Sequence, residues 1–153
     1  MKRRIFIYYS LSGNGDIVSD YLNEKHYDIR RVEVEDELPK SKVLRILSGG
    51  FLAGIHHKSK LVNFNKDIKK YQSVVIGSPV WNSNLSCPIN AVLDELDLTG
   101  KRITFILYSG SGSAKRLEKH IKDKFKDATV IHLKEPKKNK DEVKKIESNH
   151  ILV

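Results

Sequence analysis

The segment IFIYYSLSGNG, residues 5–15, joins the two features that decide the fold. Its first half is a continuous apolar run, which is typical of a strand buried on both faces of a parallel sheet. Its second half, residues 10–15, supplies two hydroxyls, an amide side chain and two glycines. Helical spacing of apolar residues begins directly afterwards, at Ile17 and Val18. A buried strand, a polar turn and a helix in this order indicate an α/β domain.

The same pattern recurs along the chain. Apolar runs at residues 74–76 and 103–107 predict two further buried strands, each followed by a turn with glycine and serine. Residues 29–35 carry charges between apolar side chains, as a half-exposed edge strand does, and residues 130–133 predict a weaker fifth strand. Apolar residues at helical spacing predict helices over residues 17–22, 89–96, 114–125, 140–148 and, in part, 41–58.

We therefore predict one α/β domain over residues 1–153, with a doubly wound five-stranded parallel sheet in the order 2-1-3-4-5 and helices on both faces. This order places the second and fifth strands at the edges, in agreement with their mixed polarity. Ligands of such sheets bind beyond the carboxyl ends of the strands, where the strand order reverses. Three loops follow strands at that point, and they form the candidate site.

Composition excludes several classes of protein. A single cysteine excludes a disulfide within the chain and a metal site built from cysteines. The longest apolar runs are about five residues, against the roughly 20 that a membrane-spanning helix needs. We therefore expect a cytoplasmic protein with no membrane span. Cys87 is either an inert thiol or one whose pKa a helix start lowers, and the scattered histidines are expected to be solvated.

The charge is strongly basic, with a formal net charge of +9. Residues 115–145 hold 12 basic and 6 acidic side chains, so this segment supplies much of the excess. Such a patch suits nucleic acid, an anionic membrane or an acidic protein partner. It is equally explained by a solvated helix face followed by a lysine-rich loop, so the charge alone does not decide the function.

The first loop, residues 10–15, is predicted to form an anion site. Its glycines let backbone N–H groups converge, and the following helix directs its positive end at the same point. No lysine follows the glycines, so the nucleoside-triphosphate P-loop pattern is absent, and there is no G-x-G-x-x-G dinucleotide pattern. A small monophosphate therefore fits best, and a helix cap that binds nothing is the alternative.

The other two loops add a flat surface and a flexible turn. Residues 77–84 place Trp81 between serines and asparagines, where an indole suits stacking on a planar ligand better than burial, although a core position is the alternative. Residues 109–113 form a small Ser/Gly turn that lets a ligand approach the backbone, or simply a turn that ends in a helix cap. Together the three loops predict a phosphate pocket beside an aromatic platform.

These segments resemble flavodoxins. IFIYYSLSGNGDIVSDYL is similar to the first strand and phosphate loop of that family, and VVIGSPVWNSNLSCPINAVLDEL to its third strand and aromatic flavin loop. FILYSGSGSAKRLEKHI corresponds to its fourth strand and Ser/Gly-rich loop, and LSGGFLAGIHHKSKL is similar to a Gly-rich insertion of a bacterial subgroup. The resemblance covers most of the first 125 residues. It implies a flavodoxin-like fold that binds FMN non-covalently.

The resemblance also implies roles for residues. The phosphate would be held by the first loop, the isoalloxazine ring by the second with Trp81 as the stacking ring, and the pyrimidine edge by the third. The candidate cofactor-binding residues are therefore Ser10, Ser12, Gly13, Asn14, Gly15, Ser78, Pro79, Val80, Trp81, Asn82, Ser109, Gly110 and Gly112. No catalytic or metal-binding residue is assigned.

One departure from the family concerns the phosphate. The threonine that usually closes the loop is Gly15 here, and Asp16 follows it. At about 5 Å and an effective dielectric constant of about 20, each unit of charge repulsion costs roughly 3 kcal/mol. Asp16 is alternatively an ordinary first-turn acid that stabilises the helix dipole. We expect FMN to be held less tightly than is typical of the family.

The functional expectation is an electron carrier that passes electrons between redox partner proteins, one of which could be acidic. The alternative is an FMN-dependent NAD(P)H oxidoreductase that acts on quinones or other small acceptors, because carriers of the family are typically acidic and this chain is basic. A flavin-free basic domain that binds nucleic acid is a lesser alternative, since no nucleic-acid-binding motif accompanies the charge. The roles of the Gly-rich segment 48–57 and of the basic C-terminal third stay open.

Overall fold

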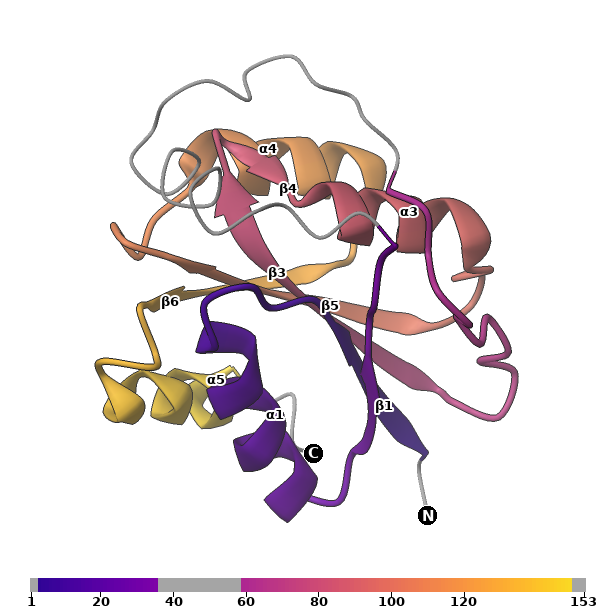
Figure 1. Cartoon of the computed structure of the whole chain (residues 1–153), viewed down its shortest axis with the longest axis horizontal. Helices are drawn as coiled ribbons and strands as arrows, with labels where there is room; N and C mark the ends of the chain where they lie inside the picture. Colours follow the sequence, from indigo (N-terminus) through magenta and orange to yellow (C-terminus); the bar gives the residue numbers. More distant parts are fainter. Residues whose placement is uncertain (1–2, 36–58, 150–153) are drawn as a thin grey trace.

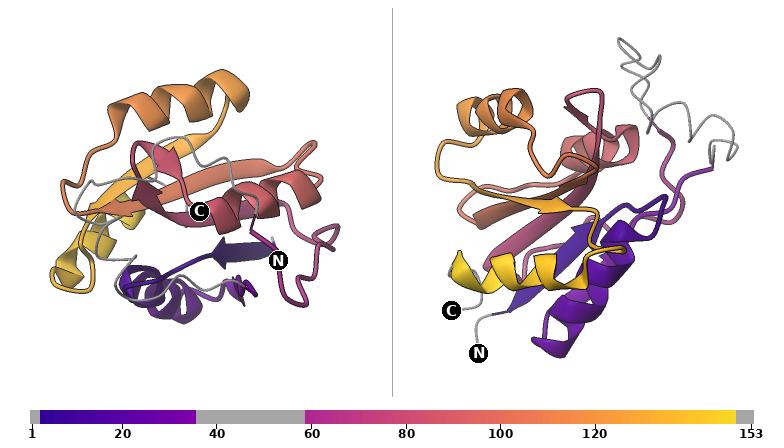
Figure 2. Two further views of the ribbon diagram at one scale, coloured as in Figure 1. Left: turned by 45° about the horizontal axis from the view of Figure 1, so that its top comes forward. Right: turned by 90° about the vertical axis from the view of Figure 1, so that its left-hand side faces the viewer.

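The computed structural model describes residues 3–35 and 59–149, which form a twisted parallel sheet with helices on both faces (Figure 1). Helices α3 and α4 cover one face, and α1 and α5 cover the other (Figure 2). The strands are β1 (Arg4–Tyr8), β2 (Asp28–Arg31), β3 (Ser73–Trp81), β4 (Asn84–Leu85), β5 (Arg102–Ser109) and β6 (Thr129–Lys134). The helices are α1 (Asn14–Glu24), α3 (Cys87–Glu95), α4 (Lys115–Lys124), the 3-10 helix η1 (Lys140–Lys144) and α5 (Lys145–Ser148).

The five main strands run parallel in the order β2-β1-β3-β5-β6, and β4 pairs antiparallel with the end of β3. Counted along the chain without β4, this order is 2-1-3-4-5, so the predicted doubly wound sheet is confirmed. The strand order reverses between β1 and β3, where Tyr8 lies opposite Gly77. The carboxyl ends of β1, β3 and β5 therefore meet at one edge of the sheet.

Burial on both faces explains the continuous apolar runs of the central strands. One core cluster lies between the sheet and helices α3 and α4, to which Val92, Leu117 and Ile121 contribute. The other lies beneath α1 and the C-terminal helices, to which Leu22 and Ile146 contribute, both fully buried. The apolar stripes predicted within the described residues thus face the sheet, because successive strand residues point to opposite faces and each face needs a helical cover.

Besides small shifts at element ends, three differences from the predicted elements concern the site or the core. β2 ends at Arg31, although the alternating pattern continues to residue 35, and only Val34 makes a further bridge, to Leu61. β3 extends four residues beyond Gly77, through Trp81, where a loop was predicted. The expected helix over residues 140–148 is divided into η1 and α5.

Some expectations concern residues outside the described ranges. The partly helical segment 41–58 and its Gly-rich part, residues 48–57, fall there, and so does part of the single domain predicted over residues 1–153, which stays a prediction. Among the described residues, none of the helices has the length and apolar character needed to cross a membrane.

We predict that Ile146→Ala lowers the free energy of unfolding by about 2–4 kcal/mol, because the fully buried side chain leaves a cavity beneath the sheet. Urea denaturation followed by circular dichroism measures this change. The exposed residue Lys144, which pairs with Asp141 on the surface, provides the control, since Lys144→Ala should cost less than about 1 kcal/mol. Equal unfolding midpoints for the two variants would show that the short C-terminal helices contribute nothing to the core.

Candidate functional site

The loop between β1 and α1 is built around the side chain of Ser10. Ser10 is 4% exposed, and its Oγ accepts hydrogen bonds from the backbone N–H groups of Gly13 (3.2 Å) and Gly15 (3.0 Å). Gly13 has a φ of 95°, a left-handed conformation that favours glycine, and it precedes α1 without a side-chain cap. The loop therefore gathers backbone N–H groups at the positive end of a helix, as anion sites do.

Further donors lie in the same first turn. The N–H groups of Asn14 and Asp16 have no hydrogen-bond acceptor among the described residues, as is usual for the first N–H groups of a helix. The Asn14 amide is held beside the loop, since its Nδ2 donates to Ser12 Oγ at 3.2 Å. The loop thus offers two unpaired N–H groups beside the pair that Ser10 already holds.

Gly15 lies buried at the base of this loop because Tyr108 occupies the space around it. A Cβ atom at residue 15 would lie 2.6 Å from Tyr108 Oη and 2.8 Å from Ser10 Cβ. The Tyr108 hydroxyl donates to the Tyr9 carbonyl, and burial raises the pKa of Tyr108 well above its usual value, so the hydroxyl stays protonated. Because the Tyr108 hydroxyl fills this space, residue 15 has to be glycine.

The carboxylate of Asp16 is bound by side chains from the neighbouring strands β1 and β2. It accepts hydrogen bonds from Tyr8 Oη at 2.8 Å and Arg31 Nε at 3.3 Å. Arg31 also donates to the Ser10 carbonyl at 2.9 Å, so it joins β2 to the loop. Burial raises the pKa of Tyr8, and the phenol remains a donor. The Arg31 charge compensates the carboxylate, so the expected repulsion of an anion by Asp16 is reduced.

The predicted open loop over residues 77–84 is wrong, because the chain forms a β-hairpin there. β3 continues to Trp81, Asn82 and Ser83 make the turn, and β4 returns antiparallel. Both turn residues have positive φ, 48° and 61°, as the right-handed twist of the two strands requires of a two-residue turn. Asparagine tolerates this conformation, which is why the polar residues appear at this point.

Trp81 is consequently buried, with 6% of its surface exposed. Its ring packs edge-on against Tyr9, with centroids 5.9 Å apart, in the core cluster that also contains Ile89 and Leu85. The indole has no open face on which a planar ligand could stack, contrary to the expected platform. Its Nε1 has no hydrogen-bond partner among the described residues, an unfavourable state for a buried donor.

The remaining candidates of this segment are divided between core and surface. Ser78 is fully buried, and its Oγ donates to the Pro79 carbonyl and accepts from the N–H of Ser86, which joins β3 to the start of α3. Pro79 is buried, Val80 is half-buried and Asn82 is exposed. Ser78 therefore has a structural role, and Asn82 is the accessible member of the group.

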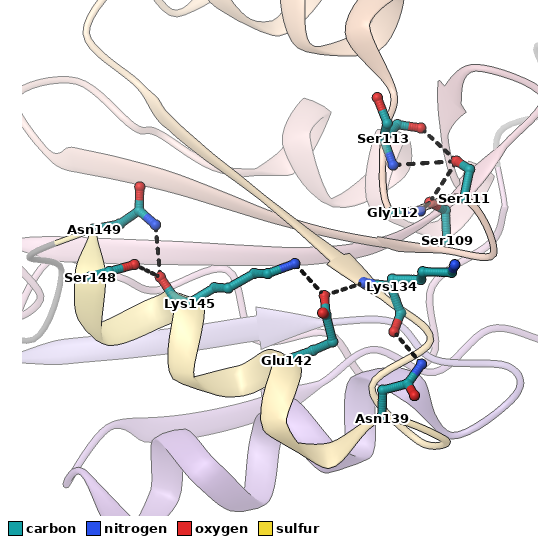
Figure 3. Close-up of polar contacts among 10 residues, drawn as sticks. All are labelled: Ser109, Ser111, Gly112, Ser113, Lys134, Asn139, Glu142, Lys145, Ser148 and Asn149. Carbon is teal, nitrogen blue, oxygen red and sulfur yellow. Dashed lines mark hydrogen bonds and ion pairs between the residues drawn. The ribbon is translucent and has the colours of Figure 1, made fainter.

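The third loop, residues 109–113, is an ordered turn whose hydroxyls bond to one another (Figure 3). Ser109 Oγ accepts from the Gly112 N–H at 3.0 Å, and Ser111 Oγ donates to the Ser113 carbonyl at 2.8 Å. Gly112 has a φ of 70°, and a Cβ there would lie 2.7 Å from Lys134 Cβ. The space beside Gly110 is open, since a Cβ there would meet no atom within 4 Å.

The segment between β6 and η1, residues 135–139, lies between the first and third loops. The Glu135 N–H donates to the Ser109 carbonyl at 3.0 Å, next to the contact of Lys134 with Gly112. At its other end, the Lys137 N–H donates to Asn14 Oδ1 and the Lys137 ammonium to the Ser12 carbonyl, both at 3.0 Å. Glu142 supports the segment by accepting from the Lys134 N–H and from the Lys145 ammonium (Figure 3).

The structure thus brings the three predicted loops to one edge of the sheet, but several of their residues have other roles than predicted. The first loop has the predicted donors, and the Tyr9 N–H bonds to the Gly77 carbonyl, which ties the first loop to the second. Tyr108, Arg31 and Lys137 were missed. Tyr108 directly follows the predicted strand 103–107, and Lys137 lies four residues after the predicted strand 130–133, so both carried the signal of a position at the carboxyl end of a strand. Arg31 lies inside the predicted strand 29–35 and carried no such signal.

Other titratable groups contribute little to this edge. Cys87 is half-buried, and burial raises the pKa of its thiol, so it is the inert alternative rather than an activated nucleophile. His132 Nε2 lies 2.8 Å from Glu118 Oε2, between β6 and α4. His26 and His120 are exposed, as expected, whereas His56, His57 and His150 lie outside the described residues.

Comparisons with known proteins agree with this geometry. A family model described as NADPH-dependent FMN reductase matches residues 10–143. A protein from Bacteroides eggerthii DSM 20697, described as a flavoprotein, has a TM-score of 0.76 at 15% identity, over 100% of this chain and 99% of that one. A flavoprotein in complex with FMN from Lactobacillus acidophilus NCFM has a TM-score of 0.59 at 22% identity, over 86% of this chain and 91% of that one. No curated protein sequence matches the chain.

At these identities the structural likeness shows the fold alone, and the family match covers most of the chain. The flavodoxin-like fold is confirmed, whereas membership of the flavodoxin family itself is not. The match also confirms FMN as the expected cofactor and places the chain among flavin-dependent oxidoreductases. The chain belongs to the NADPH-dependent FMN reductase family.

Proposed function

We propose that the chain binds FMN and acts as an NAD(P)H-dependent oxidoreductase that reduces quinones or other small acceptors. The observation that carries this proposal is the match of residues 10–143 to the reductase family. It supports the alternative of the sequence analysis better than the electron carrier, because the family description names NADPH as the reductant. The flavin-free reading loses its support, since its only basis was the positive charge.

The first loop fits the phosphate of FMN. A phosphate monoester carries close to two negative charges at neutral pH and needs several donors around it. The N–H groups of Asn14 and Asp16, the Ser12 hydroxyl and the positive end of α1 are available there. The charge of Asp16 is offset by Arg31. We infer that these groups hold the phosphate.

The ring end of the site rests on backbone groups rather than on Trp81. The exposed hairpin turn at Asn82–Ser83 and the open side of Gly110 face solvent at the same edge of the sheet. Trp81 supports the hairpin from within the core, through its edge contact with Tyr9. We propose that the turn and Gly110 contact the isoalloxazine ring.

This arrangement separates the role of FMN from the role of the protein. FMN, when bound, supplies the acceptance and donation of electrons, so the protein needs no acid, base or nucleophile of its own. The chain orients the cofactor by anchoring its phosphate at the first loop, and it leaves the ring edge open where Gly110 and the hairpin turn are exposed. A reductant and an acceptor can both approach from that side.

An electron carrier is the second candidate function. It is favoured by α4, where exposed basic side chains (Lys115, Arg116, Lys119, Lys122 and Lys124) outnumber the acidic ones, although Asp123 and Glu118 pair with Lys119 and Lys122. An acidic redox protein would be steered to this surface. NADPH turnover distinguishes the two functions, because a carrier exchanges electrons with proteins and does not oxidise NADPH rapidly.

We predict that the purified chain binds FMN with a stoichiometry of one per chain, seen as a change in flavin fluorescence. The loaded protein should then oxidise NADPH in the presence of a quinone, seen as the loss of NADPH absorbance. FMN binding without NADPH oxidation would select the carrier. A chain that binds no FMN would contradict both functions.

The glycine at residue 15 gives a second prediction. Gly15→Ala places a Cβ against Tyr108 Oη, so it should lower the free energy of unfolding by about 1–3 kcal/mol and weaken FMN binding. Thermal unfolding and flavin titration measure the two effects. Gly110→Ala is the control for stability alone, because its Cβ enters open space and should change the free energy of unfolding by less than about 0.5 kcal/mol, whereas Gly110 itself belongs to the proposed ring site. If Gly15→Ala bound FMN as well as the parent protein, the loop would not be the tightly built site described above.

A further inference from the structure

Lys137 reaches across the phosphate loop from a distant part of the chain, 125 residues after Ser12. Its N–H donates to Asn14 Oδ1, and its ammonium donates to the Ser12 carbonyl. A Cβ on Gly13 would lie 3.2 Å from Lys137 Cδ and 3.3 Å from its Nζ, so the side chain lies directly against the loop glycine. The ammonium is therefore held at the rim of the loop, next to the unpaired N–H groups of the first turn.

The charge of this lysine is not compensated as the charges of Lys138 and Lys145 are. Lys138 pairs with Glu135 at 2.6 Å, and Lys145 pairs with Glu142 at 2.7 Å. Within residues 3–35 and 59–149, no carboxylate lies at ion-pair distance from Lys137. Its ammonium contacts the Ser12 carbonyl oxygen, which carries no net charge. The positive charge of Lys137 is therefore not neutralised, and it lies beside the N–H donors of the loop. An ammonium in this setting attracts a phosphate strongly, because charge-assisted hydrogen bonds are about twice as strong as neutral ones.

We propose that Lys137 is a phosphate-binding residue of the FMN site and makes the site select FMN over riboflavin. The inference rests on the proposed function and specifies which group of the cofactor this chain recognises by charge. It also accounts for the missing hydroxyl at residue 15. Tyr108 excludes a side chain there, and a cation from the segment after β6 stabilises the dianion instead. The part of the lysine-rich run nearest the loop then has a role in cofactor binding.

The experiment titrates FMN and riboflavin, which share the ring and ribityl chain but differ in the phosphate, into four proteins: the parent chain, Lys137→Gln, Lys137→Arg and Lys140→Gln. Lys140 is an exposed lysine of η1 that makes no hydrogen bond or ion pair to the loop among the described residues, so Lys140→Gln removes the same unit of charge without removing a loop contact. Flavin fluorescence gives each dissociation constant at low and high salt, and circular dichroism checks that each variant is folded.

We expect Lys137→Gln to bind FMN roughly ten- to a hundredfold more weakly, as loss of one charged hydrogen bond predicts, and to bind riboflavin as the parent does. Its FMN affinity should also depend less on salt, because one screened charge pair is gone. Lys140→Gln should resemble the parent, and Lys137→Arg should retain most of the preference for FMN.

Two results would overturn the assignment. If Lys137→Gln bound FMN as tightly as the parent, the lysine would not contact the phosphate. If it lost FMN and riboflavin to the same extent, Lys137 would only hold the loop in shape through Asn14 and Ser12. Failure of the parent chain to bind either flavin would instead refute the proposed function itself, so the two failures are distinguishable.

Discussion

Ser10 Oγ accepts hydrogen bonds from the N–H groups of Gly13 and Gly15, and the shape of the candidate site depends on this pair of contacts. The bend that makes them possible needs a positive φ at Gly13 and no side chain at Gly15, where Tyr108 fills the space. The remaining N–H groups of the first turn then point outward at the positive end of α1. Such a loop stabilises an anion before any cationic side chain takes part.

The rest of the edge is built onto this loop by contacts between distant segments. Tyr9 pairs with β3 through the Gly77 carbonyl and packs against Trp81, which holds the hairpin in place. On the other side, the segment after β6 bonds to Ser109 through Glu135 and to the first loop through Lys137. Three loops far apart in sequence thus form one surface, because parallel strands end at the same edge and their loops are bonded to one another.

The sequence predicted the fold well and the site in part. Strand order, helices α1, α3 and α4, and the donors of the first loop follow from local patterns, namely apolar runs, helical spacing and turn residues. Trp81 could not be placed this way, since a hairpin turn and an open loop are built from the same residues, and only strand pairing distinguishes them. Tyr108, Arg31 and Lys137 depend on contacts between distant segments. Such contacts leave no local pattern, apart from the positions of Tyr108 and Lys137 after predicted strands.

The most direct test of the account follows the backbone N–H signals of the first loop by NMR while FMN is added. If the phosphate is held as described, the signals of Asn14 and Asp16 move the most and stop moving at one FMN per chain, and inorganic phosphate moves the same signals at higher concentration. If FMN binds while these two signals stay in place, the cofactor lies elsewhere, and the loop around Ser10 is only the cap of a helix.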